Sequence, residues 1–346
     1  MVILSLSFVE LSPSHAPGCD LRRGLRRSNP HFSYGDDRRE KPCRRFTGRA
    51  VGFHLFQNTK YRLTALLWSY IYDVGIYVYV YVIHRMDYKN MNIFCITNNK
   101  GGVAKTTSTV DLAYALADKG HKVLVVDTDP QCNSTYSLLG SLDQSKTLYE
   151  ILIDGTAMEQ AIVPTKHTNL FVVPCSINLS AADLMLASAH GRERKLERAI
   201  RPVKDFYDFI IIDTPPHLGV LTINALIACT DVLIPFSLTT YSLIGVGILE
   251  KTMQELRDNL DVKLPILGVF ACLDDHTNIN KNVLHAIKAM FKDKVFTTVI
   301  PRNVALEEAH NQTTSIFEYQ PQSKGAKAYE ELANEILERV KLTYGK

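Results

Sequence analysis

A glycine turn that carries two lysines joins an apolar run to a helical pattern in this chain. The apolar run covers Ile93 to Thr97, the turn reads Lys-Gly-Gly-Val-Ala-Lys-Thr-Thr over residues 100–107, and the helical pattern begins near Thr106. Backbone N–H groups of such a turn point into one concavity, and the helix N-terminus adds the positive end of its dipole. This order predicts a phosphate-binding loop, in which Lys105 neutralises the outer phosphates and Thr106 offers its hydroxyl to Mg²⁺.

Two further apolar runs end in carboxylates. The run from Val123 ends in Asp127 and Asp129, and the run from Phe209 ends in Asp213, which Thr-Pro-Pro follows. Ligands of parallel α/β sheets bind outside the carboxyl ends of the strands. We therefore expect Asp129 at the mouth of its strand, and we expect Asp213 to hold Mg²⁺, usually through water, as in a Walker B strand. Asp127 and Asp129 can also be interpreted as a strand-end cap and a turn acid.

The loop departs from the ordinary G-x-x-x-x-G-K-[ST] pattern, because Asn99 and Ala104 stand where that pattern has glycines. It resembles instead the K-G-G-x-x-K-[ST] loop of the ParA/MinD family of P-loop ATPases. From Met91 to about Arg339 the order of motifs is similar to that of ParA/Soj partition ATPases. These motifs are K-G-G-V-A-K-T at 100–106, D-T-D-P-Q at 127–131, D-T-P-P at 213–216, I-P-R-N at 300–303 and G-A-K-A-Y at 325–329. This family most often has glycine at the position of Ala104, which leaves nucleotide affinity and turnover open.

The resemblance implies a role for each matching residue. Lys105 and the loop amides bind the phosphates, Thr106 and Asp213 hold Mg²⁺, and Asp129 orients or deprotonates the attacking water. Lys100 reaches the phosphates bound by a partner subunit and acts as an arginine finger does, while Arg302 lies on the DNA-facing surface. The residues that the resemblance assigns to the nucleotide are Lys100, Gly101, Gly102, Val103, Ala104, Lys105, Thr106, Thr107, Pro301 and Asn303.

The function implied by this resemblance is plasmid or chromosome partitioning. ATP with Mg²⁺ would drive formation of a homodimer that binds DNA non-specifically, and hydrolysis of ATP to ADP and phosphate, stimulated by a ParB-like centromere-binding protein, would end the dimer. Such a protein is cytoplasmic and associated with the nucleoid. The main alternative is a MinD-like, membrane-associated regulator of cell division. The C-terminal stretch, residues 330–346, lacks the basic face with bulky aromatics that anionic lipid favours, so we expect no membrane attachment there.

Two other classes of protein use or could use this loop. An electron-transfer protein of the nitrogenase iron-protein type needs cysteines that hold a cluster between subunits. The seven cysteines here are scattered without a C-x-x-C pair, which favours a reducing cytosol and argues against a zinc site. A nucleotide-binding scaffold without enzymatic activity stays open because of Ala104.

Apolar runs alternate with helical patterns after residue 91, which predicts an α/β fold: a mostly parallel sheet with helices on both faces, as in a P-loop NTPase. We predict one ATPase domain over 91–346. The expected strands are Ile93 to Thr97, Val123 to Asp127, Leu170 to Pro174, Phe209 to Asp213, Val232 to Phe236, Ile266 to Leu273 and Val295 to Ile300. The expected helices are Thr106 to Lys119, Ser180 to Arg201, Thr222 to Ala228, Leu243 to Asn259, Lys281 to Phe291 and Lys324 to Val340.

Charge is unevenly distributed along the chain. Residues 1–90 carry 14 Lys+Arg against 7 Asp+Glu, whereas residues 91–346 carry 25 against 29. A DNA-binding surface on the ATPase part must therefore be a local patch. Arg302 is one candidate, and a basic run is the other, although a solvated helix face with ion pairs such as Arg194 with Glu197 is the favoured interpretation of that run. The run consists of Arg192, Arg194, Lys195, Arg198, Arg201 and Lys204.

Residues 1–90 form a basic, tyrosine-rich extension in which no helix or strand period holds for long. The favoured interpretation is that Met91 is the real start and that the preceding residues are upstream reading frame. The span from Leu63 to Ile83 is about long enough to cross a bilayer, with Asp73 as its only charge, so a transmembrane segment is a second interpretation. An N-terminal DNA-binding domain is a third, for which the amphipathic helices are not evident.

Overall fold

The computed structural model describes residues 3–9, 49–56, 62–72, 75–85, 92–274 and 278–345. By its internal contacts the chain divides into two units, Met1–Lys89 and Asn90–Lys346. The described strands of the first unit pair in the order β1 (Ile3–Val9), β2 (Arg49–Phe56), β3 (Arg62–Tyr72) and β4 (Gly75–Arg85), each antiparallel to the next.

The expectation that no strand period holds in the first unit is wrong. Strand β4 alternates tyrosine with valine, as at Tyr77 and Val78, and aromatic and β-branched residues in a period of two favour a strand. Most of the span from Leu63 to Ile83, interpreted from the sequence as a possible transmembrane segment, lies in β3 and β4. Among the described residues no helix is long and apolar enough to cross a membrane. A start at Met91 stays a prediction, since Met91 lies outside the described residues.

The second unit is built on an eight-stranded sheet in the order β12-β11-β10-β5-β9-β6-β8-β7. All its neighbouring strands run parallel except β7, which pairs antiparallel with β8. This confirms the predicted fold class. The strands are β5 (Asn92–Ile96), β6 (Val123–Asp127), β7 (Val163–Pro164), β8 (Leu170–Val173), β9 (Phe209–Asp213), β10 (Asp231–Ser237), β11 (Ile266–Asp274) and β12 (Val295–Pro301).

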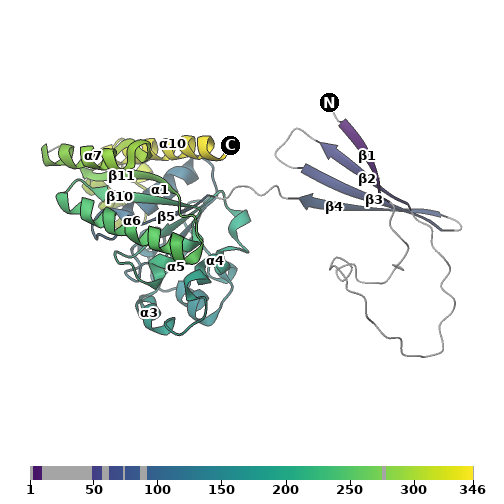
Figure 1. Ribbon diagram of the computed structural model, residues 1–346, viewed down its shortest axis with the longest axis horizontal. Coiled ribbons are helices and arrows are strands. Elements are labelled where there is room, and N and C mark those ends of the chain that lie inside the picture. The colour runs from purple at the N-terminus through teal and green to yellow at the C-terminus, as the bar shows by residue number, and fades with distance from the viewer. Residues whose placement is uncertain are drawn as a thin grey trace. The chain divides into compact units, whose positions relative to one another are not determined.

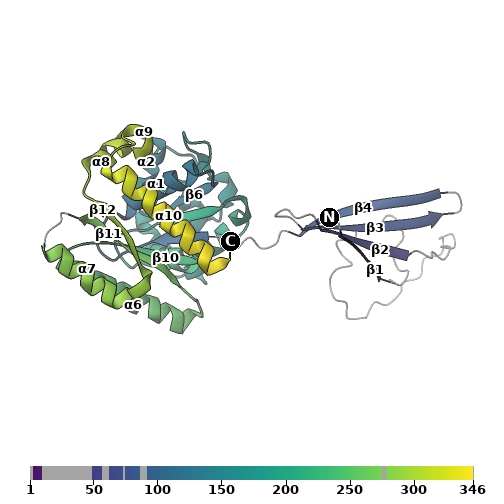
Figure 2. The same ribbon diagram turned by 90° about the horizontal axis from the view of Figure 1, so that it is seen from above.

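Helices cover both faces of this sheet (Figure 1). Alternate residues of β5 separate the two cores: Ile93 and Cys95 join one buried cluster, and Phe94 and Ile96 join the other. The first cluster contains residues of α4 (Lys195–Ile200), α5 (Val220–Ala228), α6 (Thr240–Leu260) and α7 (Asn278–Phe291). The second contains residues of α1 (Lys105–Asp118), α2 (Asn133–Leu139), α8 (Val304–Asn311), α9 (Ile316–Tyr319) and α10 (Lys324–Tyr344). Figure 2 shows α10 crossing the strands on this second face.

One helix expected from the sequence is not continuous in the structure. The segment from Ser180 to Arg201 forms two short helices, α3 (Ala182–Met185) and α4, separated by a turn at Gly191 with a φ of 61°. The α-helical hydrogen bonds end at Met185 and begin again at Lys195, and the left-handed backbone of Gly191 lies within this interruption, before a 3-10 turn at Arg192–Arg194. Helices α2, α8 and α9 were not predicted, and α8 begins where the side chain of Asn303 accepts a hydrogen bond from the Ala305 N–H.

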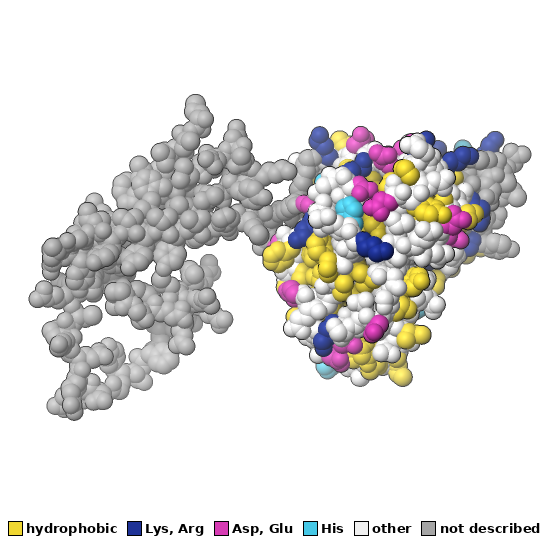
Figure 3. All heavy atoms as spheres, turned by 180° about the vertical axis from the view of Figure 1, so that it is seen from behind, with side chains coloured by type: hydrophobic (Ala, Val, Ile, Leu, Met, Phe, Trp, Pro, Cys, Tyr) yellow, Lys and Arg dark blue, Asp and Glu magenta, His cyan; other side chains and the backbone are white. Residues whose placement is uncertain are grey.

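Basic and acidic side chains are interspersed on the face of the second unit shown in Figure 3. This mixture agrees with the nearly balanced charge of residues 91–346 in the sequence. A DNA-binding surface in this unit would therefore be local, as the sequence predicts.

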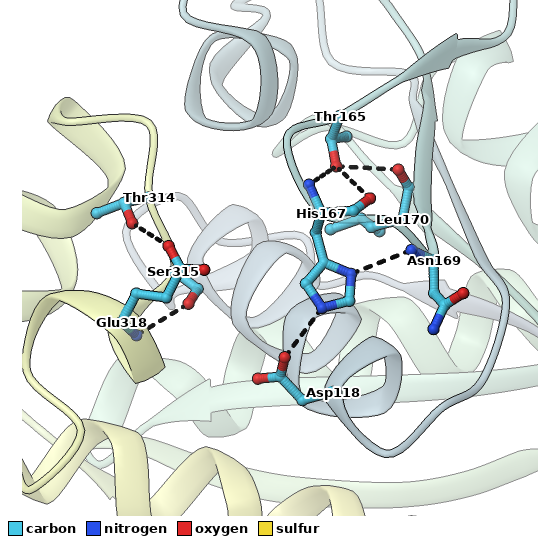
Figure 4. Close-up of polar contacts among 8 residues, drawn as sticks. All are labelled: Asp118, Thr165, His167, Asn169, Leu170, Thr314, Ser315 and Glu318. Atoms are coloured by element: carbon cyan, nitrogen blue, oxygen red, sulfur yellow. Dashed lines mark hydrogen bonds and ion pairs between the residues drawn. The ribbon is translucent and has the colours of Figure 1, made fainter.

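A polar turn fixes the short antiparallel end of the sheet. The Thr165 hydroxyl lies 2.9 Å from the Leu170 carbonyl oxygen, and the Asn169 N–H donates to Nδ1 of His167 (Figure 4). Nε2 of His167 lies 3.0 Å from Oδ1 of Asp118, the last residue of α1. The turn between β7 and β8 is thereby attached to the helix that follows the glycine loop.

Candidate functional site

The predicted loop lies at the carboxyl end of β5, between β9 on one side and β10 on the other. Strands β6 and β9 run in register, and the register places Asp127 opposite Asp213. The strand ends therefore bring the loop and the two carboxylate stretches together at one edge of the sheet, as expected for a parallel α/β site. Sequence positions more than 100 residues apart meet here.

The backbone of the loop has the shape of an anion-binding turn. Gly102 has a φ of 67°, and Ala104, the residue before α1, has a φ of 63° and a ψ of 34°. Only glycine adopts this left-handed region without steric cost, so the β-carbon of Ala104 costs about 1 kcal/mol. The departure from glycine at position 104 is thus accommodated with the loop conformation retained.

Lys105 crosses the loop and is nearly buried, with 7% of its surface exposed. Its ammonium donates a hydrogen bond to the carbonyl oxygen of Lys100 at 3.1 Å. Burial lowers the pKa of Lys105, while the charges of Asp213 and Asp129 oppose this shift. A nearly buried cation in a glycine turn, close to the charges of two carboxylates, is suited to the outer phosphates of a nucleotide and its metal ion.

Asp213 is fully buried and surrounded by hydroxyl donors. Ser134 Oγ donates to it at 2.6 Å, Thr109 Oγ1 lies 3.3 Å away, and Thr106 also hydrogen-bonds it. Burial raises the pKa of Asp213 to about 6, against the hydrogen bonds from Ser134 and Thr106. A hydroxyl beside a carboxylate is the oxygen donor set that Mg²⁺ prefers, so these residues fit the predicted metal.

The carboxylate of Asp127 accepts hydrogen bonds from residues that follow its own strand. Its Oδ2 accepts from the Thr135 N–H at 2.9 Å and from the Thr135 hydroxyl at 2.6 Å, while its Oδ1 accepts from the Asp129 N–H. Burial, followed by the charge of Asp213, raises the pKa of Asp127 to about 7. This carboxyl therefore fixes the backbone that carries Asp129, in line with its interpretation as a strand-end cap.

Asp129 lies beside a cavity of about 320 Å³. Its Oδ1 accepts a hydrogen bond from the Gln131 N–H, and 7% of its surface is exposed. The cavity gives this carboxylate room for a water molecule. Neither the loop nor Asp213 lines it, so the role of Asp129 toward the attacking water stays a prediction. The lining residues are Asp129, Pro130, Gln131, Leu179, Ser180, Pro216, His217 and Leu221.

Lys100, the other lysine of the loop, contacts the opposite side of the site. Its ammonium donates to Thr239 Oγ1 at 2.8 Å and to Ser237 Oγ at 3.3 Å, both at the carboxyl end of β10. In a single chain the side chain is thus directed to hydroxyls of its own chain. Its reach to a partner subunit stays a prediction.

The segment Ile300 to Asn303 lies away from the loop in the sheet order, since it begins in edge strand β12, and strands β11 and β10 intervene before β5. Pro301 ends β12, Arg302 is exposed, and the Asn303 side chain caps α8. The roles of Pro301 and Asn303 at the nucleotide and of Arg302 at DNA stay predictions.

In the basic run the predicted pair between Arg194 and Glu197 is present at 3.1 Å, and Lys195 donates to the carbonyl oxygen of Leu152. These contacts favour the structural interpretation of the run.

Sequence reasoning missed the polar residues that support the loop. They share one signal, a hydroxyl or amide side chain within a few residues of a strand end or a glycine turn, but that signal is common in loops. They are Asn98, Thr109, Ser134, Thr135, Ser237, Thr239 and Ser242.

Comparisons with known proteins identify relatives of this chain. A family model described as an AAA domain matches residues 91–266. The chain is 44% identical over 246 residues to the sporulation initiation inhibitor protein Soj of Bacillus subtilis, covering 70% of this chain and 97% of that protein. It is 41% identical over 243 residues to the chromosome-partitioning ATPase Soj of Treponema pallidum, covering 70% and 95%. The solved structure of cobyrinic acid a,c-diamide synthase from Mycobacterium smegmatis, with a bound ATP analogue and magnesium, has a TM-score of 0.64 and 32% identity, covering 74% and 97%.

Proposed function

The chain belongs to the ParA/Soj family of partition ATPases, and on that premise we propose that ATP joins two copies of it into a dimer that binds DNA without sequence preference. The protein is an ATPase that uses ATP and Mg²⁺. Hydrolysis to ADP and phosphate separates the dimer and releases the DNA. The observation that carries this proposal is the pair of lysines in one loop, one facing buried carboxylates and the other donating to the hydroxyls of Ser237 and Thr239.

Phosphoryl transfer asks a protein mainly to position water and to neutralise charge. Lys105 and the amides of residues 101–107 bind the phosphates, and Thr106 with Asp213 holds Mg²⁺, which supplies charge neutralisation when bound. Asp213 is fully buried behind hydroxyl groups, which supports a contact through Thr106 or through water. Asp129 orients or deprotonates the attacking water beside its cavity.

Lys100 completes the site of the other copy. It lies at the surface side of the loop, and a charged amine at the transferring phosphoryl group is the function that an arginine finger performs. Because each copy supplies one lysine to its partner, ATP binding and dimerisation are coupled.

Arg302 is the proposed contact to DNA, since it is an exposed cation after an edge strand. A phosphate contact makes binding depend on salt, so Arg302→Glu should weaken DNA retention most at low salt and spare ATP binding. An electrophoretic mobility assay over a salt series measures this, and retention equal to that of the unmodified protein would exclude the surface. The proposed stimulating partner is a ParB-like protein, and the proposed location is the nucleoid.

The C-terminal helix supports partitioning over the MinD-like alternative. Leu332, Ile336 and Val340 of α10 are buried in the second core cluster. The apolar face of this helix is therefore used in packing, whereas a membrane-bound amphipathic helix needs that face for lipid. Sedimentation with anionic liposomes would detect membrane attachment directly.

The central experiment compares Lys100→Ala with Lys146→Ala, a control at another exposed lysine. Dimer formation with ATP and Mg²⁺ is measured by analytical ultracentrifugation, and ATP binding by calorimetry. We expect Lys100→Ala to bind ATP but to stay monomeric, and Lys146→Ala to dimerise normally. A Lys100→Ala protein that still dimerises would remove the cross-subunit role.

A further inference from the structure

Three hydroxyl side chains form a small cluster around the ammonium of Lys100. Thr239 Oγ1 and Ser237 Oγ accept from Lys100 Nζ at 2.8 Å and 3.3 Å. Ser242 Oγ, which is fully buried, lies 2.9 Å from Ser237 Oγ and 3.1 Å from Thr239 Oγ1. The buried serine thus orients both acceptors, and the lysine is held by oriented neutral groups.

The backbone is arranged so that Lys100 can reach this cluster. Asn98 donates through its amide to the Pro235 carbonyl oxygen at 2.7 Å and accepts from the Lys100 N–H at 3.1 Å, which ties the start of the loop to β10. Helix α6 approaches closely because residue 245 is glycine. A β-carbon on Gly245 would lie 3.3 Å from Asn98 Oδ1 and 3.6 Å from the Lys100 β-carbon.

We propose that Ser237, Thr239 and Ser242 form a holding site that retains the Lys100 ammonium on its own chain, so that this lysine must leave it when two copies join. The inference rests on the proposed cross-subunit role of Lys100. The three hydroxyls are positioning residues, because they act through the lysine. The holding site makes dimerisation conditional, since Lys100 gives up hydrogen bonds to its own chain before it can serve the partner.

The chemistry of the acceptors makes this exchange reversible. Thr239 is exposed and Lys100 is half-buried, so the hydrogen bonds between them are in contact with water and are weak. A phosphate is an anionic acceptor and binds an ammonium more strongly than a neutral hydroxyl does. The lysine is therefore released when a partner presents a triphosphate and is retained otherwise.

Thr239→Val tests the proposal, because valine keeps the branched shape and removes only the hydroxyl. The Thr239 side chain makes no capping hydrogen bond to α6, so the helix start should persist. Two holding sites open per dimer, so we expect the dissociation constant of the ATP-bound dimer to fall roughly tenfold or more. Thr314→Val is the matched control, since Thr314 donates to Glu318 on another surface (Figure 4), and it should leave the constant unchanged.

A double variant separates a holding site from a general effect on structure. If Thr239 acts through the lysine, Lys100→Ala with Thr239→Val should dimerise no better than Lys100→Ala alone. Ser242→Ala, which removes the orienting hydroxyl, should tighten the dimer in the same direction by a smaller factor. An unchanged or weaker dimer in Thr239→Val, or equal tightening in the Lys100→Ala background, would overturn the holding site. The proposed function fails separately, if Lys100→Ala alone dimerises like the unmodified chain.

Discussion

The two lysines of the loop lie five residues apart and have opposite surroundings. Lys105 is nearly buried and faces the carboxylates of Asp213 and Asp129, whereas Lys100 is half-buried and its ammonium donates to the neutral hydroxyls of Ser237 and Thr239. Moving a charged group away from buried charges of opposite sign requires much free energy. Moving one that is held by neutral groups near water requires little. This contrast makes Lys105 the fixed lysine and Lys100 the one whose surroundings allow the movement that the proposed cross-subunit role requires.

Loss of the fixed lysine should have the largest effect. Lys105→Ala removes the cation inside the loop and leaves Asp213 and Asp129 facing the phosphates unopposed, so we expect ATP affinity to fall by roughly a hundredfold or more. Isothermal calorimetry with ATP and Mg²⁺ measures it, with Lys146→Ala as the control. If Lys105→Ala bound ATP as tightly as Lys100→Ala, the two lysines would not differ in the way described.

Asp129→Ala tests the role of a carboxylate that faces Lys105. The loop and both lysines stay in place, so ATP binding and dimerisation should persist, while hydrolysis falls by about 10²- to 10⁴-fold because the water loses its acceptor. A phosphate-release assay beside ultracentrifugation should show a long-lived ATP dimer. Asp143→Ala, at an exposed acid, is the control. Hydrolysis at the normal rate in Asp129→Ala would return this residue to its interpretation as a turn acid.

The buried carboxyls should also affect stability as a function of pH. The pKa of Asp127 rises from its ordinary 3.8 to about 7 on folding, so between these values the folded chain binds a proton that the unfolded chain has lost. The stability that this group contributes is present at low pH and is lost as the pH rises through about 7. Asp127→Asn should flatten the fall in melting temperature between about pH 4 and 7. Asp143→Asn should leave the slope unchanged, and an unchanged slope in Asp127→Asn would contradict the shift.

The smallest effect concerns the loop backbone that separates the two lysines. Ala104→Gly removes a β-carbon from a left-handed position and should stabilise the chain by about 0.5–1 kcal/mol. Ala157→Gly is the opposite control, because Ala157 is exposed with a φ of −64° and glycine there only adds entropy to the unfolded chain. Urea denaturation distinguishes the two, and a loss of stability in both variants would mean that Ala104 carries no strain.

Seven of the eight strands of the second unit were predicted, and the central ones were predictable because they are short apolar runs buried on both faces, as in Val123 to Asp127 and Phe209 to Asp213. The two-residue strand β7 was not predicted. The loop and its neighbouring carboxylates were predictable for a related reason, since motifs at strand ends meet at one edge of a parallel sheet. The roles of these residues toward ATP, Mg²⁺ and DNA stay predictions.

Two kinds of feature could not be predicted from the sequence. The interruption between α3 and α4 depends on the backbone conformation of a turn that includes Gly191, and apolar periodicity does not predict it. The contact between Lys100 and Thr239 joins residues 139 positions apart, and its partners are ordinary hydroxyl residues that no motif singles out. Such contacts follow from the order of the strands, with β10 beside β5, and that order depends on long-range pairing.

The two edges of the large sheet are closed in different ways. At one edge β7 is only two residues long and includes Pro164, which has no N–H to offer. At the other edge the Glu335 carboxylate of α10 accepts from the N–H groups of Thr297 and Thr298 in β12. Neither edge therefore offers a long row of unpaired backbone N–H groups with which a strand from another molecule could pair. We therefore expect the large sheet to resist edge-to-edge pairing between copies at high local concentration, which keeps contacts between the second units reversible.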